Sequence, residues 1–178
     1  MTLLDLARGP ALEWSLIIFV GASLWRLVAV LLARRTRDLS EPRSHSTLAG
    51  GARAVFSRFK PRPEFHAGAM STVILGYVMH IGLAIVVFLF TPQILFIDSL
   101  LGLSWPGISN DLVMFVGAIT VAALIALLVR RLTVPVLKAI SSLDDYVSWL
   151  LTLLPVVTGM MAYAHIGGPY QTVLAIHI

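Results

Sequence analysis

A single histidine, His80, lies in the middle of a long apolar stretch of this 178-residue sequence. Tyr77-Val78-Met79 precede it and Ile81-Gly82-Leu83 follow it, so its imidazole has an apolar setting on both sides. A titratable ring is costly to bury at bilayer depth and usually has a partner there. The residue types leave three roles open for His80: a hydrogen-bonded packing residue, a proton-relay group, or an axial ligand of haem iron.

A second histidine, His177, favours the haem role. It lies about six residues, or ~9 Å of helix, below the outer end of its own apolar stretch, whereas His80 lies ~15 Å deep. Since the ends of helices are uncertain by a few residues, two antiparallel helices can present one imidazole to each face of a haem. Gly76 and Gly82 flank His80 and leave room for a macrocycle against the backbone. The sequence contains no cysteine, which excludes disulfides, thiolate iron–sulfur ligation and c-type haem attachment within this chain.

The elements that must position these histidines are apolar stretches long enough to cross a hydrocarbon core of roughly 30 Å as helices. Hydrophobic residues make up 58% of the sequence and charged residues only 12%. A soluble protein needs more charged residues than this on its surface, whereas a protein surrounded by lipid does not. We therefore predict an all-α integral membrane helical bundle, one domain over residues 1–178. Four complete spans and the start of a fifth are expected at Leu12–Leu32, Ala67–Phe90, Leu112–Val129, Tyr146–Ala164 and Thr172–Ile178.

The loops predict the orientation of the bundle. The first loop, residues 34–66, carries eight Lys or Arg residues, and the third adds Arg130, Arg131 and Lys138. The second loop, Thr91–Asp111, carries none. By the positive-inside rule, the N-terminus lies outside and both basic loops lie in the cytoplasm. The basic charge is thus explained by orientation, without any role in nucleic-acid binding.

The basic loop 34–66 is rich in Ser, Pro, Gly and Arg, so we expect irregular backbone with a short amphipathic piece around Ala54–Phe59. It can serve as a solvated loop that meets anionic headgroups or as a docking surface for a soluble partner.

In the fourth stretch, Pro155 removes one backbone donor, and Thr152 or Thr158 can help to satisfy the carbonyl that it frees. Gly159, one turn later, allows close approach of a bulky group or another helix.

Several segments together resemble the membrane cytochrome b subunits of the respiratory nitrate reductase gamma type, including their heterodisulfide-reductase-like and sulfite-reduction-associated relatives. The resemblance covers roughly Gly68 to the end of the sequence. It rests on the order and spacing of Tyr77–Leu83, Ser99–Pro106, Arg130–Pro135, Asp144–Tyr146, Leu153–Gly159 and Leu174–His177.

This resemblance implies a five-helix protein of a bacterial or archaeal cytoplasmic membrane that holds haem b through histidines on its second and fifth helices. It implies His80 and His177 as the ligands, with electrons passing between quinone (menaquinone) and an iron–sulfur subunit on the cytoplasmic side. Where nitrate reductase members or their relatives carry a further histidine, this sequence has Phe90 and Gln93, so we expect one haem. We also expect that the printed sequence holds only the beginning of the fifth helix.

Three residues at the expected outer interface, Trp105, Tyr163 and His165, have hydrogen-bonding or stacking groups that suit a quinone, and they equally suit an aromatic belt. Asp144 and Asp145 precede the fourth stretch, where we expect them to cap the helix. We assign no catalytic residue.

Two alternatives to an electron-transfer subunit remain. One is a cofactor-free membrane anchor or assembly subunit in which His80 only bonds across helices, and the other is a small proton-coupled transporter.

Overall fold

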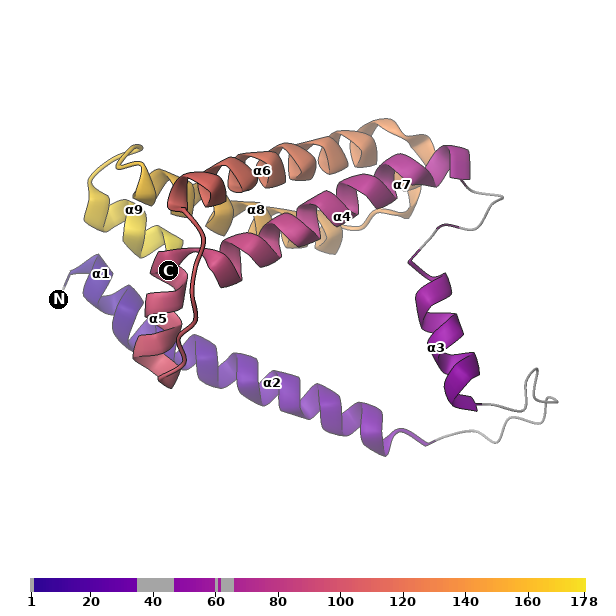
Figure 1. Ribbon diagram of the computed structural model, residues 1–178, viewed down its shortest axis with the longest axis horizontal. Helices are drawn as coiled ribbons and strands as arrows, with labels where there is room; N and C mark the ends of the chain where they lie inside the picture. Colours follow the sequence, from indigo (N-terminus) through magenta and orange to yellow (C-terminus); the bar gives the residue numbers. More distant parts are fainter. Residues whose placement is uncertain (1, 35–46, 60, 62–65) are drawn as a thin grey trace.

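The computed structural model describes residues 2–34, 47–59, 61 and 66–178, and the regular elements in this part of the chain are all helices, without a strand (Figure 1). The predicted all-α class is therefore confirmed. The elements in chain order are α1 (Leu3–Leu6), a wider π-type turn η1 (Ala7–Ala11), α2 (Leu12–Leu32), α3 (Thr47–Ser57), α4 (His66–Leu89), α5 (Thr91–Leu101), α6 (Asn110–Thr133), α7 (Pro135–Ile140), α8 (Leu143–Tyr163) and α9 (Tyr170–His177).

Four segments of the described chain are long and apolar enough to cross a membrane, which makes this a multi-pass membrane protein. They agree with the predicted spans to within a few residues, except at the first, which continues back through η1 and α1. The outward faces of these helices carry exposed large apolar side chains, as lipid contact requires. The four spans are Leu3–Leu32, Gly68–Leu89, Asn110–Thr133 and Leu143–Tyr163.

Helix α6 contacts both α4 and α8, which run beside it in Figure 1. Its buried residues recur every three or four positions, which puts them on one stripe of the helix. Thr120 is fully buried there and lies over Gly82 of α4, so that any side chain at position 82 would meet the threonine. Gly117 in turn lies under Met160 of α8. Small residues thus let the three helices approach closely.

Polar bonds also join these spans. The indole of Trp149 on α8 donates to the backbone carbonyl of Leu124 on α6, at 2.8 Å. At the same end of the bundle, Arg130 of α6 donates from Nε to the hydroxyl of Thr72 on α4, at 3.2 Å. Both bonds satisfy groups that lipid would leave without a partner.

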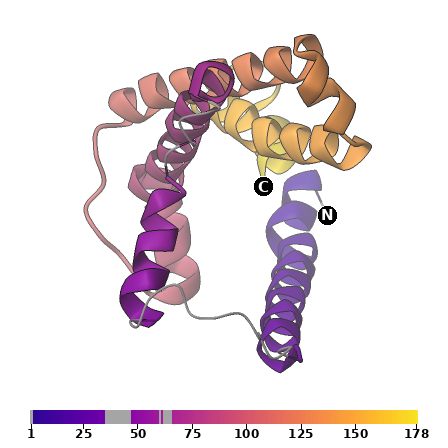
Figure 2. The same cartoon turned by 90° about the vertical axis from the view of Figure 1, so that its right-hand side faces the viewer.

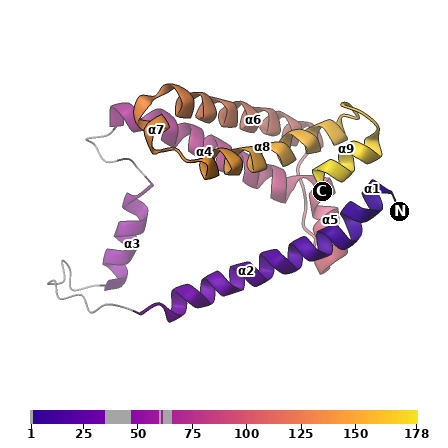
Figure 3. The same cartoon turned by 180° about the vertical axis from the view of Figure 1, so that it is seen from behind.

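Helix α2 leaves the other spans along most of its length, as the end-on and reverse views show (Figures 2 and 3). None of its residues is buried. Its amino-terminal neighbours α1 and η1 contact α9 instead, which ties the beginning of the chain to the end of α8 and α9. The bend lies in η1, where Gly9 leaves helical geometry (φ −98°, ψ −110°) beside Pro10.

The structure adds one helix that the sequence analysis did not predict and corrects two local expectations. The second loop contains a helix, α5, which begins with Pro92 near its first position and ends at Gly102 in the left-handed conformation. In the basic loop, the helix α3 begins at Thr47 and is longer than the piece expected at Ala54–Phe59; residues 35–46, 60 and 62–65 lie outside the described chain.

Pro155 sits inside a continuous α8, and the two nearby threonines do not serve the carbonyl that it frees, which belongs to Leu151. The hydroxyl of Thr152 donates to Ser148, and that of Thr158 donates to Leu154, each at 2.8 Å. Each therefore bonds to the carbonyl four residues back, which is the geometry a threonine reaches most easily in a helix.

Candidate functional site

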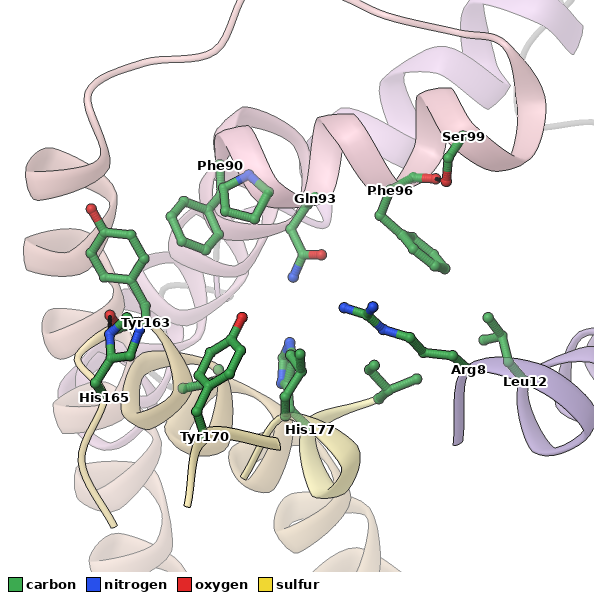
Figure 4. Close-up of a pocket in the computed structure, with 15 residues that line it drawn as sticks. Arg8, Leu12, Phe90, Gln93, Phe96, Ser99, Tyr163, His165, Tyr170 and His177 are labelled. Carbon is green, nitrogen blue, oxygen red and sulfur yellow. Dashed lines mark hydrogen bonds between the residues drawn. The ribbon is translucent and has the colours of Figure 1, made fainter. Parts of the chain in front are cut away.

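A cavity of about 790 Å³ lies where η1, α5, α8 and α9 meet, at the end of the bundle that holds the second loop (Figure 4). Its size is within the range of small-molecule sites, roughly 300–1,000 Å³. It is lined by Arg8, Leu12, Phe90, Pro92, Gln93, Phe96, Ser99, Gly159, Ala162, Tyr163, His165, Tyr170, Leu174, His177 and Ile178.

The wall formed by α9 exists because the chain reverses after α8. Gly167 and Gly168 both take positive φ values, 88° and 139°, which side-chain-bearing residues rarely adopt. His165 takes φ 55° in the same turn, and its Nδ1 bonds to the carbonyl of Tyr163 at 3.0 Å. The turn folds α9 back against α8 and so carries His177 onto the part of α8 around Pro155.

His177 is held on α8 by its ring. Its Nδ1 lies 3.0 Å from the carbonyl of Pro155 and 3.4 Å from the hydroxyl of Thr158. Since a carbonyl can only accept, Nδ1 is the donor in the bond to Pro155. The ring lies directly on Gly159, where a Cβ would come within 2.7 Å of Cε1. The predicted close approach at Gly159 is thus confirmed, and the group that approaches is His177.

Three more polar side chains point into the same space as His177: Arg8 from η1, Gln93 from α5 and Tyr170 from α9 (Figure 4). Arg8 has no ion-pair partner among the described residues. The cavity therefore combines a cation, an amide, a phenol and an imidazole within mainly apolar walls, a combination that suits a polar headgroup on an apolar molecule.

Aromatic rings form part of the wall. Phe90 meets Tyr163 edge to face, with ring centroids 5.4 Å apart, and His165 stacks on Tyr170 at 5.0 Å. Two of the three predicted quinone residues, Tyr163 and His165, therefore line this cavity. Trp105 does not line it, because its indole donates to the carbonyl of Phe88 at 2.5 Å and fixes the second loop against the end of α4.

The structure does not bring His80 and His177 into one cavity. His177 shares its cavity with Phe90, which lies ten residues beyond His80 on α4, a distance of ~15 Å along the helix. The similar depth of the two histidines that the sequence suggested stays a prediction. His80 is exposed on the surface of α4, and its Nδ1 bonds to the carbonyl of Gly76 at 2.7 Å.

A haem held jointly by these two histidines stays a prediction, and the cavity of His177 does not include His80. Taken alone, His80 has the form of a ligand: its Nδ1 donates to a backbone carbonyl, Nε2 is free to bind, and the space beside Gly76 is open. Gly82, in contrast, lies against Thr120 and serves contact between α4 and α6, so its expected role beside a haem is not supported.

Sequence reasoning missed Arg8, Gln93 and Tyr170, because only the fold places them around His177. It also passed over Arg26, a charge inside the first span with no partner among the described residues. A charge within a span is itself a signal of function or of an interface, and it could have been found from the sequence.

No protein-family model, no curated protein and no solved structure matches this chain.

Proposed function

We propose that this chain is the quinone-binding membrane subunit of an electron-transfer complex, with the cavity around His177 as its quinone site. The observation that carries the proposal is the imidazole of His177, which is fixed by its Nδ1 bond to Pro155 in an amphipathic cavity together with Arg8, Gln93 and Tyr170. A quinone has two oxygens on an aromatic ring and an apolar tail, and it needs this mixture of groups.

The side chains suit the two-electron oxidation of a quinol. Nε2 of His177 accepts the proton of one quinol hydroxyl, and the charge of Arg8 stabilises the oxygen anion that remains. Gln93 and Tyr170 donate hydrogen bonds to the quinone oxygens, while the rings of Phe90 and Phe96 cover the quinone plane. Quinol gives quinone, two protons and two electrons; the protons leave at the outer end, and the electrons pass to the redox groups of the complex.

The proposal includes one haem b with His80 as its ligand on this chain, and an iron–sulfur subunit on the cytoplasmic side as the electron partner. The hydrogen bond from His80 to Gly76 and the open surface there support the first part. The haem supplies one-electron transfer when bound, and its second ligand comes from a residue other than His177. The absence of iron–sulfur ligands in a chain without cysteine supports the need for a partner.

A binding measurement tests the quinone site. Isothermal titration of the full-length protein in detergent with menaquinone-1 is expected to show saturable binding that is weakened about tenfold in His177→Ala, the cost of losing one strong hydrogen bond. Trp105→Phe is the matched control, since Trp105 lies outside the cavity, and we expect unchanged affinity. Absence of binding to the wild type, or equal affinity of wild type and His177→Ala, would refute the proposal.

A reduced-minus-oxidised spectrum tests the haem separately. The full-length protein purified with its partners is expected to show a b-type band that His80→Ala removes and His177→Ala leaves in place. Loss of the band in His177→Ala would restore the joint ligation expected from the sequence. A wild-type protein without the band would end the haem part of the proposal and leave the quinone site to its own test.

A further inference from the structure

A second cavity lies at the opposite end of the bundle, where α7 joins α6 to α8 (Figure 1). Its volume of about 310 Å³ is at the lower end of the range for small-molecule sites. All three close-packed spans and α7 contribute to it. It is lined by Thr72, Met79, Leu124, Leu127, Arg130, Arg131, Leu137, Ile140, Asp145, Ser148, Trp149 and Thr152.

The two arginines of this cavity differ in their partners. Arg131 is neutralised by Asp145, with Nη1 2.9 Å from Oδ1, and also donates to Ser141 at 3.0 Å. Arg130 has no carboxylate partner among the described residues. Its Nε donates to Thr72 and its Nη2 to the carbonyl of Gly68, both at 3.2 Å, which holds the guanidinium in place and leaves Nη1 uncommitted.

The cavity therefore carries one net positive charge, on Arg130, held by neutral groups. Hydroxyl groups of Thr72 and Ser148 lie on the same lining. A positioned guanidinium beside hydroxyl donors suits a phosphate oxygen, which it binds through short, charge-assisted hydrogen bonds.

The rest of the lining is apolar, with Met79, Leu124 and Leu127 between the spans and Leu137 and Ile140 on α7. A free phosphate ion gains nothing from such walls, whereas the glycerol and upper acyl chain of a phospholipid do. Basic pockets between spans at the cytoplasmic side have the charge and position to bind anionic headgroups, and the predicted orientation puts this cavity there.

We infer that this cavity binds the phosphodiester headgroup of an anionic phospholipid, with Arg130 as the residue that holds the phosphate. The site is separate from the quinone cavity and does not depend on it. Bound there, the lipid spans α4, α6 and α8 and stabilises their contact at the inner end.

Native mass spectrometry of the full-length protein, titrated with dioleoyl-phosphatidylglycerol or dioleoyl-phosphatidylcholine, tests this inference. We expect one saturable phosphatidylglycerol site that phosphatidylcholine does not fill. Arg130→Gln is expected to weaken it roughly tenfold or more, as for the loss of a hydrogen bond to a charged group. Arg130→Lys keeps the positive charge but lacks the paired N–H donors of the guanidinium. Its affinity for phosphatidylglycerol is expected to lie between those of the wild type and Arg130→Gln.

Lys138→Gln is the matched control, because it removes the same charge from the exposed side of α7 outside the cavity. Its lipid affinity is expected to equal that of the wild type. Equal losses in Arg130→Gln and Lys138→Gln would reduce the effect to general surface charge and overturn the site. Displacement of the lipid by millimolar inorganic phosphate would mean that the cavity binds a free ion. Loss of the lipid when the partner subunit binds would mean that Arg130 contacts that protein. Either result would overturn the inference.

Discussion

The two intramembrane histidines make the same kind of hydrogen bond in different surroundings. Each directs Nδ1 to a backbone carbonyl, Gly76 for His80 and Pro155 for His177, and so each keeps Nε2 for another group. His80 bonds within its own helix, one turn back, while His177 bonds across to α8. The first can form wherever the helix forms, whereas the second exists only because the glycine turn folds α9 onto α8.

The contact between His177 and Gly159 gives a prediction at the scale of one methyl group. In Gly159→Ala, the new Cβ would meet the imidazole at 2.7 Å, so the ring has to leave its place on Pro155. We expect menaquinone-1 to bind at least several-fold more weakly, as measured by calorimetry. Gly21→Ala on α2, where nothing lies within 4 Å, is the control and is expected to bind as the wild type does. Equal binding by both variants would show that the position of His177 does not matter to the quinone.

At the scale of elements, α6 is the helix on which the bundle depends, because it contacts both α4 and α8. Its contact with α4 is closest where Thr120 meets Gly82. Spans in lipid gain little from the hydrophobic effect between helices, so close van der Waals packing of this kind contributes a large part of their association.

The pair Gly82 and Thr120 therefore predicts a coupled effect on stability. Gly82→Ala is expected to lower the free energy of unfolding by about 1–3 kcal/mol, since it overfills a closed contact. Adding Thr120→Ala, which removes the opposing atoms, is expected to recover part of that loss. Gly76→Ala on the same helix has open space around it and is expected to stabilise by roughly 0.5–1 kcal/mol through helix propensity.

Reversible unfolding in mixed detergent, followed by circular dichroism, measures all four proteins of this cycle and the Gly76 control. Additive effects of Gly82→Ala and Thr120→Ala would mean that the two residues do not touch in the membrane, and the arrangement of α4 and α6 would need revision.

At the scale of the whole molecule, the two cavities lie at opposite ends of the spans, and so does the chemistry proposed for them. The cavity of His177 collects protonatable and aromatic groups together with Arg8, while the second cavity holds Arg130, Arg131 and Asp145. Such a separation allows protons to be released on one side while electrons leave toward a partner on the other.

The predicted orientation is tested by cysteine labelling. The chain has no cysteine of its own, so only the introduced cysteine can react. A membrane-impermeant maleimide added to intact cells is expected to label Ser104→Cys in the second loop. Ser57→Cys in α3 is expected to react only after the membrane is permeabilised. The reverse pattern would place the cavity of His177 on the cytoplasmic side and contradict the outer quinone site.

The sequence by itself determined the class and the spans of this protein. A run of about 20 apolar residues forms a membrane-spanning helix almost independently of the rest of the chain. Each span could therefore be found by itself, as was the case for Gly68–Leu89, Asn110–Thr133 and Leu143–Tyr163. His80 and His177 could also be found in this way, since a titratable residue in an apolar run is visible without any fold.

Only the tertiary structure decided which residues meet. The position of His177 on α8 depends on the turn at Gly167 and Gly168, which folds α9 back, and this turn does not follow from the length of a helix. Arg8, Gln93 and Tyr170 come from three separate elements, one of which, α5, the apolar pattern did not reveal. Contacts between elements depend on their packing, so a pattern within one element cannot specify them.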